Sequence, residues 1–386
     1  MKFGLKLFSA GYILSVLLLL FYSFTQVDLS LTLSRVSVWQ GIQKFFQHIG
    51  YFDRPLSAYL FVGIVSVLFI FYLTILWMVK NKKISEGLVW VLIVLTTVIL
   101  TFSYNAFSYD LFNYIFDAKI ITYYSQNPYD HKALDFPGDP MLSFMHWTHR
   151  TYPYGPVWLL FTVPLSFLGF KLLLPTLILF KLLMSASFLL ACYAIYRLAK
   201  KTVGNELFVL GFFAFNPLVL VESLVSAHND IVMMALVLMA MVWFLDKKYA
   251  GSVVLLGLSV GVKFATGLLL PVFLLLRKNV HMAYGAGLLL MVGAVLVATQ
   301  RTTFQPWYLL YALPFAALLS KKYFISISAV VLSIAALLQY LPFLYVGNWD
   351  TPIPQTLNQI MIGGIVLSII LTGSWFIKTA MLRKWK

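Results

Sequence analysis

Long apolar stretches alternate with short polar ones over most of this chain. Several of the apolar stretches approach the length that an α-helix needs to cross a bilayer, about 20 residues. The clear runs are residues 7–24, 58–79, 88–102, 172–198, 207–221, 231–245, 281–298, 308–319, 325–344 and 359–377. This pattern predicts an all-α fold, a polytopic transmembrane helical bundle with about 11 to 13 spans.

The interval from residue 25 to residue 56 is longer than most and carries an amphipathic sequence. Its aromatic and polar residues recur at a spacing that places them on different sides of a helix. The aromatic set is Trp39, Phe45 and Phe46, and the polar set is Gln40, Lys44 and Gln47. We expect one or two amphipathic helices on the membrane surface here.

Two apolar segments do not fit simple crossings. Residues 157–170 would add a crossing that the charge pattern described below does not allow, so we expect a partial, re-entrant helix that returns to the outer side. The runs 252–262 and 265–276 are short and flank Lys263. They predict a helical hairpin that turns at this lysine.

The composition excludes a soluble globular domain. Hydrophobic residues make up 61% of the chain and charged residues 11%, whereas soluble domains are about 25% charged. The formal net charge is +15, but the basic residues gather in short clusters between the apolar runs. We interpret them as topology signals beside anionic lipid rather than as a nucleic-acid surface.

Positive clusters normally face the cytoplasm. Applied to this chain, the rule predicts an integral protein of the plasma membrane with both termini in the cytoplasm. It places the polar interval 105–156 outside the cytoplasm. We treat residues 1–386 as one polytopic domain that contains this interval as its active-site loop. The single cysteine, Cys192, permits no internal disulfide.

The interval 105–156 holds five of the thirteen acidic residues and three of the six histidines. A polar loop of this length usually carries function. Asp110, Tyr114 and Asp117 share one helix face, because they are spaced at i, i+4 and i+7. The other side, with Leu111, Phe112 and Ile115, would suit a helix lying on a membrane. Asp110 is a candidate general base; the alternative is a carboxylate that only keeps an interfacial helix hydrated.

The end of the same loop reads Tyr152-Pro-Tyr154-Gly-Pro, a rigid entry into the next helix with aromatics at headgroup depth. His146 and His149 could share one helical turn, and Asp135 and Asp139 could add oxygen ligands. These ligands match no established zinc pattern, so no metal site is predicted, although a divalent cation is left open.

Glu222, His228, Asn229 and Asp230 fall in one short outer loop. Asp230 is placed to cap the following helix, and that alone could explain it. Four polar groups in so short a loop favour a binding or catalytic site instead.

Two cations stand where a membrane protein rarely has them. Lys263 interrupts an apolar stretch, and an ionisable residue at membrane depth is a functional candidate by default. If the turn lies near water, the side chain reaches it at little cost and has no further role. Arg301 lies at an outer helix end, against the positive-inside trend, and an anionic ligand would account for it. Arg150 is a weaker candidate of the same kind.

The motifs that bind nucleotides, GxxxxGK[ST] and GxGxxG, are absent, as is the GxSxG element of acyl transfer. Instead, the order YD, DAK, NPY and YPYGP in the first long loop resembles the GT-C superfamily of integral-membrane glycosyltransferases. The later stretches FNPLVLVESLVSAHND, GLSVGVKFATGLLLP and QPWYLLYALP are similar to its bacterial polyprenyl-phosphate-mannose-dependent mannosyltransferases. The resemblance covers residues 7–319.

The resemblance implies site roles. Asp110 would activate the acceptor hydroxyl, and Asp117 could share or take that role because SYD replaces the paired acids of many relatives. Lys263 and Arg301 would hold the lipid phosphate, with His228 as a further donor contact. We add Asn229, Asp230 and Glu222 to the donor site. The loop residues Tyr114, Tyr152, Tyr154 and Arg150 would lie on the acceptor side.

The implied activity is transfer of a hexose, most simply mannose, from a polyprenyl-phosphate-linked donor to a glycan or glycolipid acceptor, with inversion. The partners would be that donor, that acceptor and the bilayer, with no nucleic acid. A transporter or flippase of a lipid-linked sugar is the alternative, although no internal repeat supports it. A lipid-linked oligosaccharide polymerase or ligase would share the chemistry but take a longer donor.

Overall fold

The computed structural model describes residues 2–384 and is helical throughout. Within that range there is no β-strand, only an isolated bridge between Lys132 and Thr151. The prediction of an all-α polytopic bundle is confirmed. Among the described residues, six helices are long and apolar enough to cross a membrane, or seven if the bent pair Glu206–Ala214 and Pro217–Val225 forms one span.

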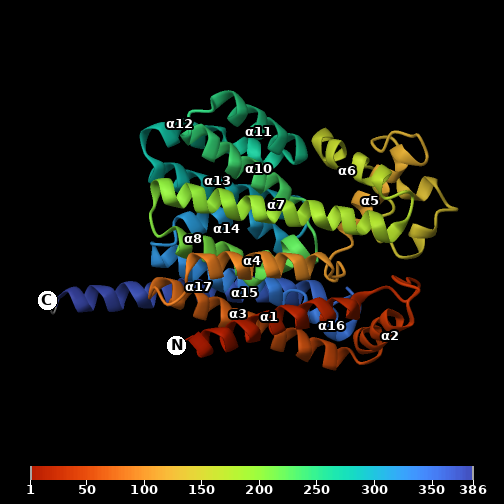
Figure 1. Ribbon diagram of the computed structural model, residues 1–386, viewed down its shortest axis with the longest axis horizontal. Coiled ribbons are helices and arrows are strands. Elements are labelled where there is room, and N and C mark those ends of the chain that lie inside the picture. The colour runs from red at the N-terminus through yellow and green to blue at the C-terminus, as the bar shows by residue number, and fades with distance from the viewer. Residues whose placement is uncertain (1, 385–386) are drawn as a thin grey trace. The chain divides into compact units, whose positions relative to one another are not determined.

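The long apolar helices are labelled in Figure 1. They are α1 (Lys2–Ser23), α3 (Arg54–Lys80), α7 (Leu173–Thr202), α13 (Val280–Arg301), α15 (Tyr323–Leu338, continued by α16, Leu341–Val346) and α17 (Ile353–Lys384). The remaining α-helices are α2 (Ser37–Phe52), α4 (Glu86–Thr101), α5 (Asp110–Thr122), α6 (Pro156–Leu168), α8 (Glu206–Ala214), α9 (Pro217–Leu220), α10 (Asp230–Leu245), α11 (Tyr249–Val262), α12 (Leu270–Lys278) and α14 (Leu309–Leu318).

Several apolar helices are shorter than a bilayer requires, which is why fewer spans qualify by length than the 11 to 13 expected. α6 has 13 residues, beginning at Pro156 and ending before Gly169. This agrees with a partial helix at residues 157–170, and its re-entrant course stays a prediction. The break expected at Lys263 is present, because α11 ends at Val262 and a 3-10 segment, Phe264–Leu269, precedes α12.

The chain divides into two compact units. The first consists of Met1–Asp53, Glu86–Ala194 and Leu220–Leu268, and the second of Arg54–Ser85, Ile195–Val219 and Leu269–Lys386. All the predicted site residues except Arg301 belong to the first unit.

Hydroxyl groups join the helices of the first unit, as is common where helices pack within a membrane. Tyr12 of α1 bonds to Thr96 of α4 at 2.9 Å. α10 and α11 lie side by side (Figure 1), and Ser259 Oγ donates to the Met233 carbonyl at 2.8 Å.

The amphipathic helix expected before residue 56 is α2, and its polar side faces inward. Gln43 Nε2 donates to the Leu31 carbonyl at 2.6 Å, and Gln47 Nε2 donates to the Asp28 carbonyl at 3.0 Å. Phe45, on the opposite side, is exposed, and so is Trp39 in the first turn. The helix therefore uses its amides to bind the preceding loop and leaves these two aromatic side chains exposed.

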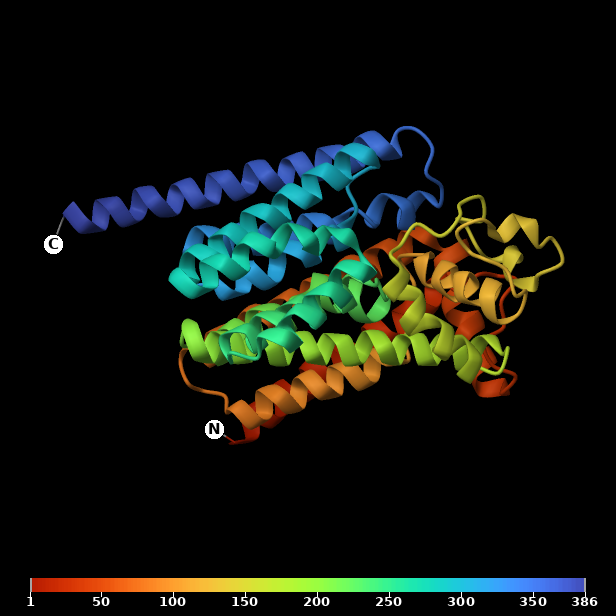
Figure 2. The same cartoon turned by 90° about the horizontal axis from the view of Figure 1, so that it is seen from above.

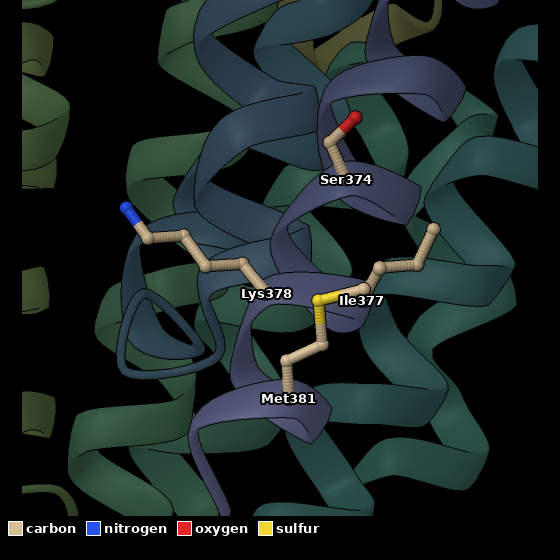
Figure 3. A pocket seen from close by; sticks show the side chains of 4 residues that line it. All are labelled: Ser374, Ile377, Lys378 and Met381. Carbon is tan, nitrogen blue, oxygen red and sulfur yellow. The ribbon is translucent and has the colours of Figure 1, made fainter.

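In the second unit, α15 and α17 pack closely. A Cβ added at Gly364 would lie 2.5 Å from Ala335 Cβ, and Ser368 bonds to Ser328 at 2.8 Å. The C-terminal part of α17 extends past its neighbours in this unit (Figure 2). Figure 3 shows a shallow hollow on α17 lined by Ser374, Ile377, Lys378 and Met381. It has no carboxylate or imidazole, and the candidate chemistry lies elsewhere.

Candidate active site

Asp110 begins α5, and the local sequence explains why the helix starts there. Ser108 Oγ accepts a hydrogen bond from the Asp110 backbone N–H at 3.2 Å. A carboxylate in the first turn is favourable because a helix N-terminus carries partial positive charge. Leu111, Phe112 and Ile115 are buried, so this apolar face is covered by protein rather than laid on a membrane.

The imidazole of His228 lies between two carboxylates. Its Nδ1 is 3.5 Å from Asp110 Oδ2, and its Nε2 is 3.4 Å from Glu222 Oε2. The side chains of His228 and Glu222 are fully buried, whereas Asp110 keeps 17% of its side-chain surface exposed. Of the three groups, Asp110 is the one that a second molecule can reach.

An interrupted helix brings Glu222 and His228 together. α9 continues into a π-helical segment, Val221–Val225, that carries Glu222. The chain then leaves the helix through Ala227, which is left-handed at φ 60°. The His228 N–H donates to the Glu222 carbonyl at 3.0 Å. Single π-helical turns of this kind occur often at functional sites.

Lys263 follows α11 in an extended conformation and reaches the same segment. Its Nζ lies 2.7 Å from Asp230 Oδ1, at the start of α10, and 5.6 Å from the centre of the Tyr154 ring. The side chain of Lys263 is 19% exposed, and that of Asp230 is fully buried. An ammonium group has three N–H donors, so the bond to Asp230 leaves donors for an anion.

A close approach of α6 and α11 places Tyr154 beside Lys263. The Gly155 N–H donates to the Val262 carbonyl at 3.1 Å. A Cβ on Gly155 would lie 2.1 Å from the carbonyl oxygen of Gly261. A side chain at position 155 would therefore force the two backbones apart.

The predicted loop tyrosines surround this cluster. Tyr114 is buried, and its hydroxyl donates to Asn229 Oδ1 at 3.3 Å. Its ring meets that of Tyr154 edge to face, with centroids 5.3 Å apart. The Tyr152 hydroxyl donates to the Gly155 carbonyl at 2.7 Å. Tyr114 and Tyr154 thus contact the cluster directly, and Tyr152 supports the turn that carries Tyr154.

Asp117 lies on the same helix as Asp110 in a different environment. The residue is 7% exposed. Burial, and to a smaller extent the negative charge of Asp110, raises the pKa of Asp117 well above its ordinary value. A carboxyl that holds its proton is a poor general base.

The rim of the loop holds Arg150 in a defined position. Its guanidinium lies 4.4 Å from the centre of the Trp147 ring, and Asn113 of α5 donates to the Trp147 carbonyl at 3.1 Å. Trp147 is exposed. Asn113 lies one turn along α5 from Asp110. An aromatic face beside a planar cation is suited to a sugar ring with hydroxyl groups.

Among residues 2–384, no group of three or more His, Cys, Asp or Glu side chains is arranged to hold a metal ion. Asp139, considered above as an oxygen ligand, is engaged within the loop. It forms an ion pair with Lys119 and accepts from the Tyr124 hydroxyl at 2.6 Å. Burial alone would raise the pKa of Asp139, but these hydrogen bonds lower it below its ordinary value.

Arg301 is exposed at the end of α13 in the second unit. Its expected place beside Lys263 stays a prediction. So do the individual roles assigned to the other site residues.

Lys181 is a candidate that the sequence patterns above do not single out. It is 1% exposed, in the N-terminal third of α7. The available signal is a lone lysine inside the apolar run 172–198. A lysine in such a run can also extend its side chain to water at a helix end. Only the neighbours of Lys181 in the structure show that it is buried instead.

These features define a polytopic helical membrane protein with carboxylate, imidazole and ammonium groups gathered in one buried cluster. Residues 11–279 match the family described as alpha-(1->6)-mannopyranosyltransferase, N-terminal domain, and the chain belongs to this family. This confirms the resemblance to the mannosyltransferases.

Over 147 residues, or 38% of the chain, it is 26% identical to alpha-(1->6)-mannopyranosyltransferase A of Corynebacterium glutamicum. The aligned part is 30% of that protein, so the chain spans less than a third of the relative it matches. No solved structure matches the chain.

Proposed function

We propose that this protein transfers mannose from a polyprenyl-phosphate-linked donor to a glycan or glycolipid acceptor at the extracytoplasmic face, with inversion at the anomeric carbon. The observation that carries the proposal is the arrangement around Asp110. An accessible carboxylate has a buried imidazole behind it, and a partly exposed ammonium, Lys263, joins the same cluster through Asp230. We take the transferred sugar to be mannose because the chain belongs to a mannosyltransferase family.

The proposed reaction is a single displacement. The acceptor hydroxyl oxygen bonds to the anomeric carbon while the bond from that carbon to the phosphate oxygen breaks. Asp110 takes the hydroxyl proton, and the electron pair leaves with the polyprenyl phosphate. Lys263 stabilises the charge that grows on the phosphate.

His228 and Glu222 are buried, and they act through Asp110. An imidazole within ion-pair reach of Asp110 Oδ2 holds the carboxylate in one orientation and offers a second place for its proton. Trp147 and Arg150 receive the acceptor sugar at the rim, because an aromatic face and a guanidinium suit its apolar and hydroxyl surfaces.

A lipid-linked donor is proposed because the site is expected to lie outside the cytoplasm. Outside the cytoplasm no nucleotide sugar is available, so an activated sugar must arrive on a lipid whose phosphate is the leaving group. All the candidate site residues except Arg301 lie in one unit, whereas transporters often show internal repeats around a site at the midplane. An enzyme therefore accounts for the arrangement better than a flippase does.

The test uses purified protein in liposomes with labelled polyprenyl-phosphate-mannose and a series of glycan and glycolipid acceptors. We expect transfer by the wild type, and a loss of about 100- to 10,000-fold in Asp110→Asn, the range of general-base catalysis. Asp130→Asn, in an exposed part of the same loop, is the matched control and should keep wild-type activity.

Movement of the labelled lipid between leaflets without sugar transfer would favour the flippase. Wild-type turnover by Asp110→Asn would remove that carboxylate from the role of base.

A further inference from the structure

Lys181 is a buried cation that the reaction above does not use. Three oxygens surround its ammonium group in the first unit. Nζ donates to Ser103 Oγ at 2.9 Å, to the Val225 carbonyl at 3.0 Å and to the Leu224 carbonyl. Because an ammonium has three N–H donors and no acceptor, these contacts match its whole hydrogen-bonding capacity. None of the three partners is a carboxylate.

The two carbonyls lack their ordinary helical donors. In a continuing α-helix, the Leu224 carbonyl would accept from the N–H of His228. That N–H bonds to the Glu222 carbonyl instead, at 3.0 Å, because the chain leaves the helix through Ala227. Buried carbonyls without partners are costly. Lys181 supplies the missing donors, as cations commonly do at helix C-termini.

The third partner belongs to the segment that leads to Asp110. Ser103 follows α4, and Asn105 Nδ2 donates to the Ser108 carbonyl at 3.0 Å. Ser108 Oγ in turn accepts from the Asp110 N–H. One ammonium group therefore contacts both the segment that leads from α4 to Asp110 and the π-helical segment before His228.

We propose that Lys181 is a positioning residue that sets the distance between the Asp110 carboxylate and the His228 imidazole. The inference rests on the proposed function, since it deepens the account of the same site. The side chain is covered by protein and touches neither substrate. It acts by fastening two chain segments, far apart in the sequence, to one helix. A desolvated charge stabilises a fold poorly, so its placement here is better explained by geometry than by stability.

The test compares Lys181→Met, which keeps length but has no donor, with Ser185→Ala. Ser185 lies one turn further along α7, and its hydroxyl bonds to that of Thr101 of α4 at 2.7 Å. We expect Lys181→Met to lower kcat for mannosyl transfer about 10- to 100-fold with the donor KM nearly unchanged, because small misplacements at a reacting centre have effects of this size. Ser185→Ala should stay within about threefold of the wild type.

Two further measurements separate positioning from general damage. In Lys181→Met/His228→Gln, kcat should fall little below that of His228→Gln alone, because both changes disturb one arrangement. Lys181→Gln, which keeps an amide donor, should recover part of the lost kcat. Independent losses that multiply in the double variant, or equal losses in Lys181→Met and Ser185→Ala, would overturn the proposal.

Amide hydrogen exchange gives a readout that needs no substrate. Peptides covering residues 222–230 should exchange faster in Lys181→Met than in Ser185→Ala. If the wild type transfers no mannose, the proposed function fails, and this comparison still decides whether Lys181 anchors the segment. If residues 222–230 exchanged at the same rate in Lys181→Met and in the wild type, Lys181 would not anchor this segment, even if mannosyl transfer is found.

Discussion

Asp110 and Asp117 show how burial assigns different chemistry to identical side chains on one helix. Asp110 is partly exposed and faces an imidazole, whereas Asp117 is buried with a raised pKa. Both were candidate bases from their shared face, and the sequence spacing offers no way to rank them. The ranking comes from solvent access, which depends on what packs against each residue.

The first prediction concerns Asp117. Because its folded pKa is raised, its protonated form is favoured, and the stability that it contributes is present at low pH and lost as the pH rises through that pKa. Asp117→Asn cannot ionise, so thermal unfolding above neutral pH should occur at the wild-type Tm or higher. Mannosyl transfer should stay within about threefold of the wild type. A loss as large as that of Asp110→Asn would make Asp117 the base.

The second prediction concerns Lys263, the partly exposed cation of the cluster. Removing its ammonium in Lys263→Ala should weaken retention of polyprenyl phosphate by about 10-fold or more, since charge-assisted hydrogen bonds contribute about 1.5–3 kcal/mol. A lipid-binding assay in detergent measures this directly. Lys132→Ala, in the 105–156 loop, is the control. Equal affinity in Lys263→Ala and the wild type would exclude Lys263 as a phosphate ligand.

At the scale of elements, the site depends on interrupted helices. The π-helical turn before His228, the extended residue at Lys263 and the glycine contact between α6 and α11 all depart from regular helix. Apolar periodicity predicts where helices run. The break at Lys263 is predicted from the lysine, because its charge interrupts an apolar stretch. It does not predict the π-helical turn, because residues 221–225 are as apolar as their neighbours apart from Glu222 and Ser223.

The third prediction tests the glycine contact. A methyl group in Gly155→Ala would meet the Gly261 backbone oxygen, so α6 and α11 must separate. Overpacking of this kind costs about 1–3 kcal/mol, and both Tm and transfer activity should fall. Gly257→Ala, one turn before Gly261 in α11, has open space around it and should leave both unchanged. Equal behaviour of the two variants would show that the contact is not needed.

At the scale of the whole molecule, the sidedness of the membrane decides which donor is available. The distribution of basic clusters predicts that the 105–156 loop lies outside the cytoplasm. Each unit contains helices of bilayer length, and the donor argument requires the first unit's polar cluster to face away from the cytoplasm.

The fourth prediction is therefore a topology. Cys192 is buried, so it should react little with a maleimide. The labelling of an introduced cysteine can therefore be measured above a low background. In intact cells, Asp130→Cys should react with a membrane-impermeant maleimide, whereas Lys248→Cys should react only after permeabilisation. If Lys248→Cys reacted in intact cells and Asp130→Cys only after permeabilisation, the loop would lie in the cytoplasm. The reason for a lipid-linked donor would then be lost.

The sequence by itself determined the class of the protein, the course of most helices and the segments that carry chemistry. These properties depend on local hydrophobicity and residue type, which can be read along the chain. Only the tertiary structure decided that His228 stands between Asp110 and Glu222, that Lys263 pairs with Asp230, and that Lys181 contacts two separate segments. Most of these pairings join residues from distant segments, and they arise because buried polar groups must satisfy one another wherever packing brings them together.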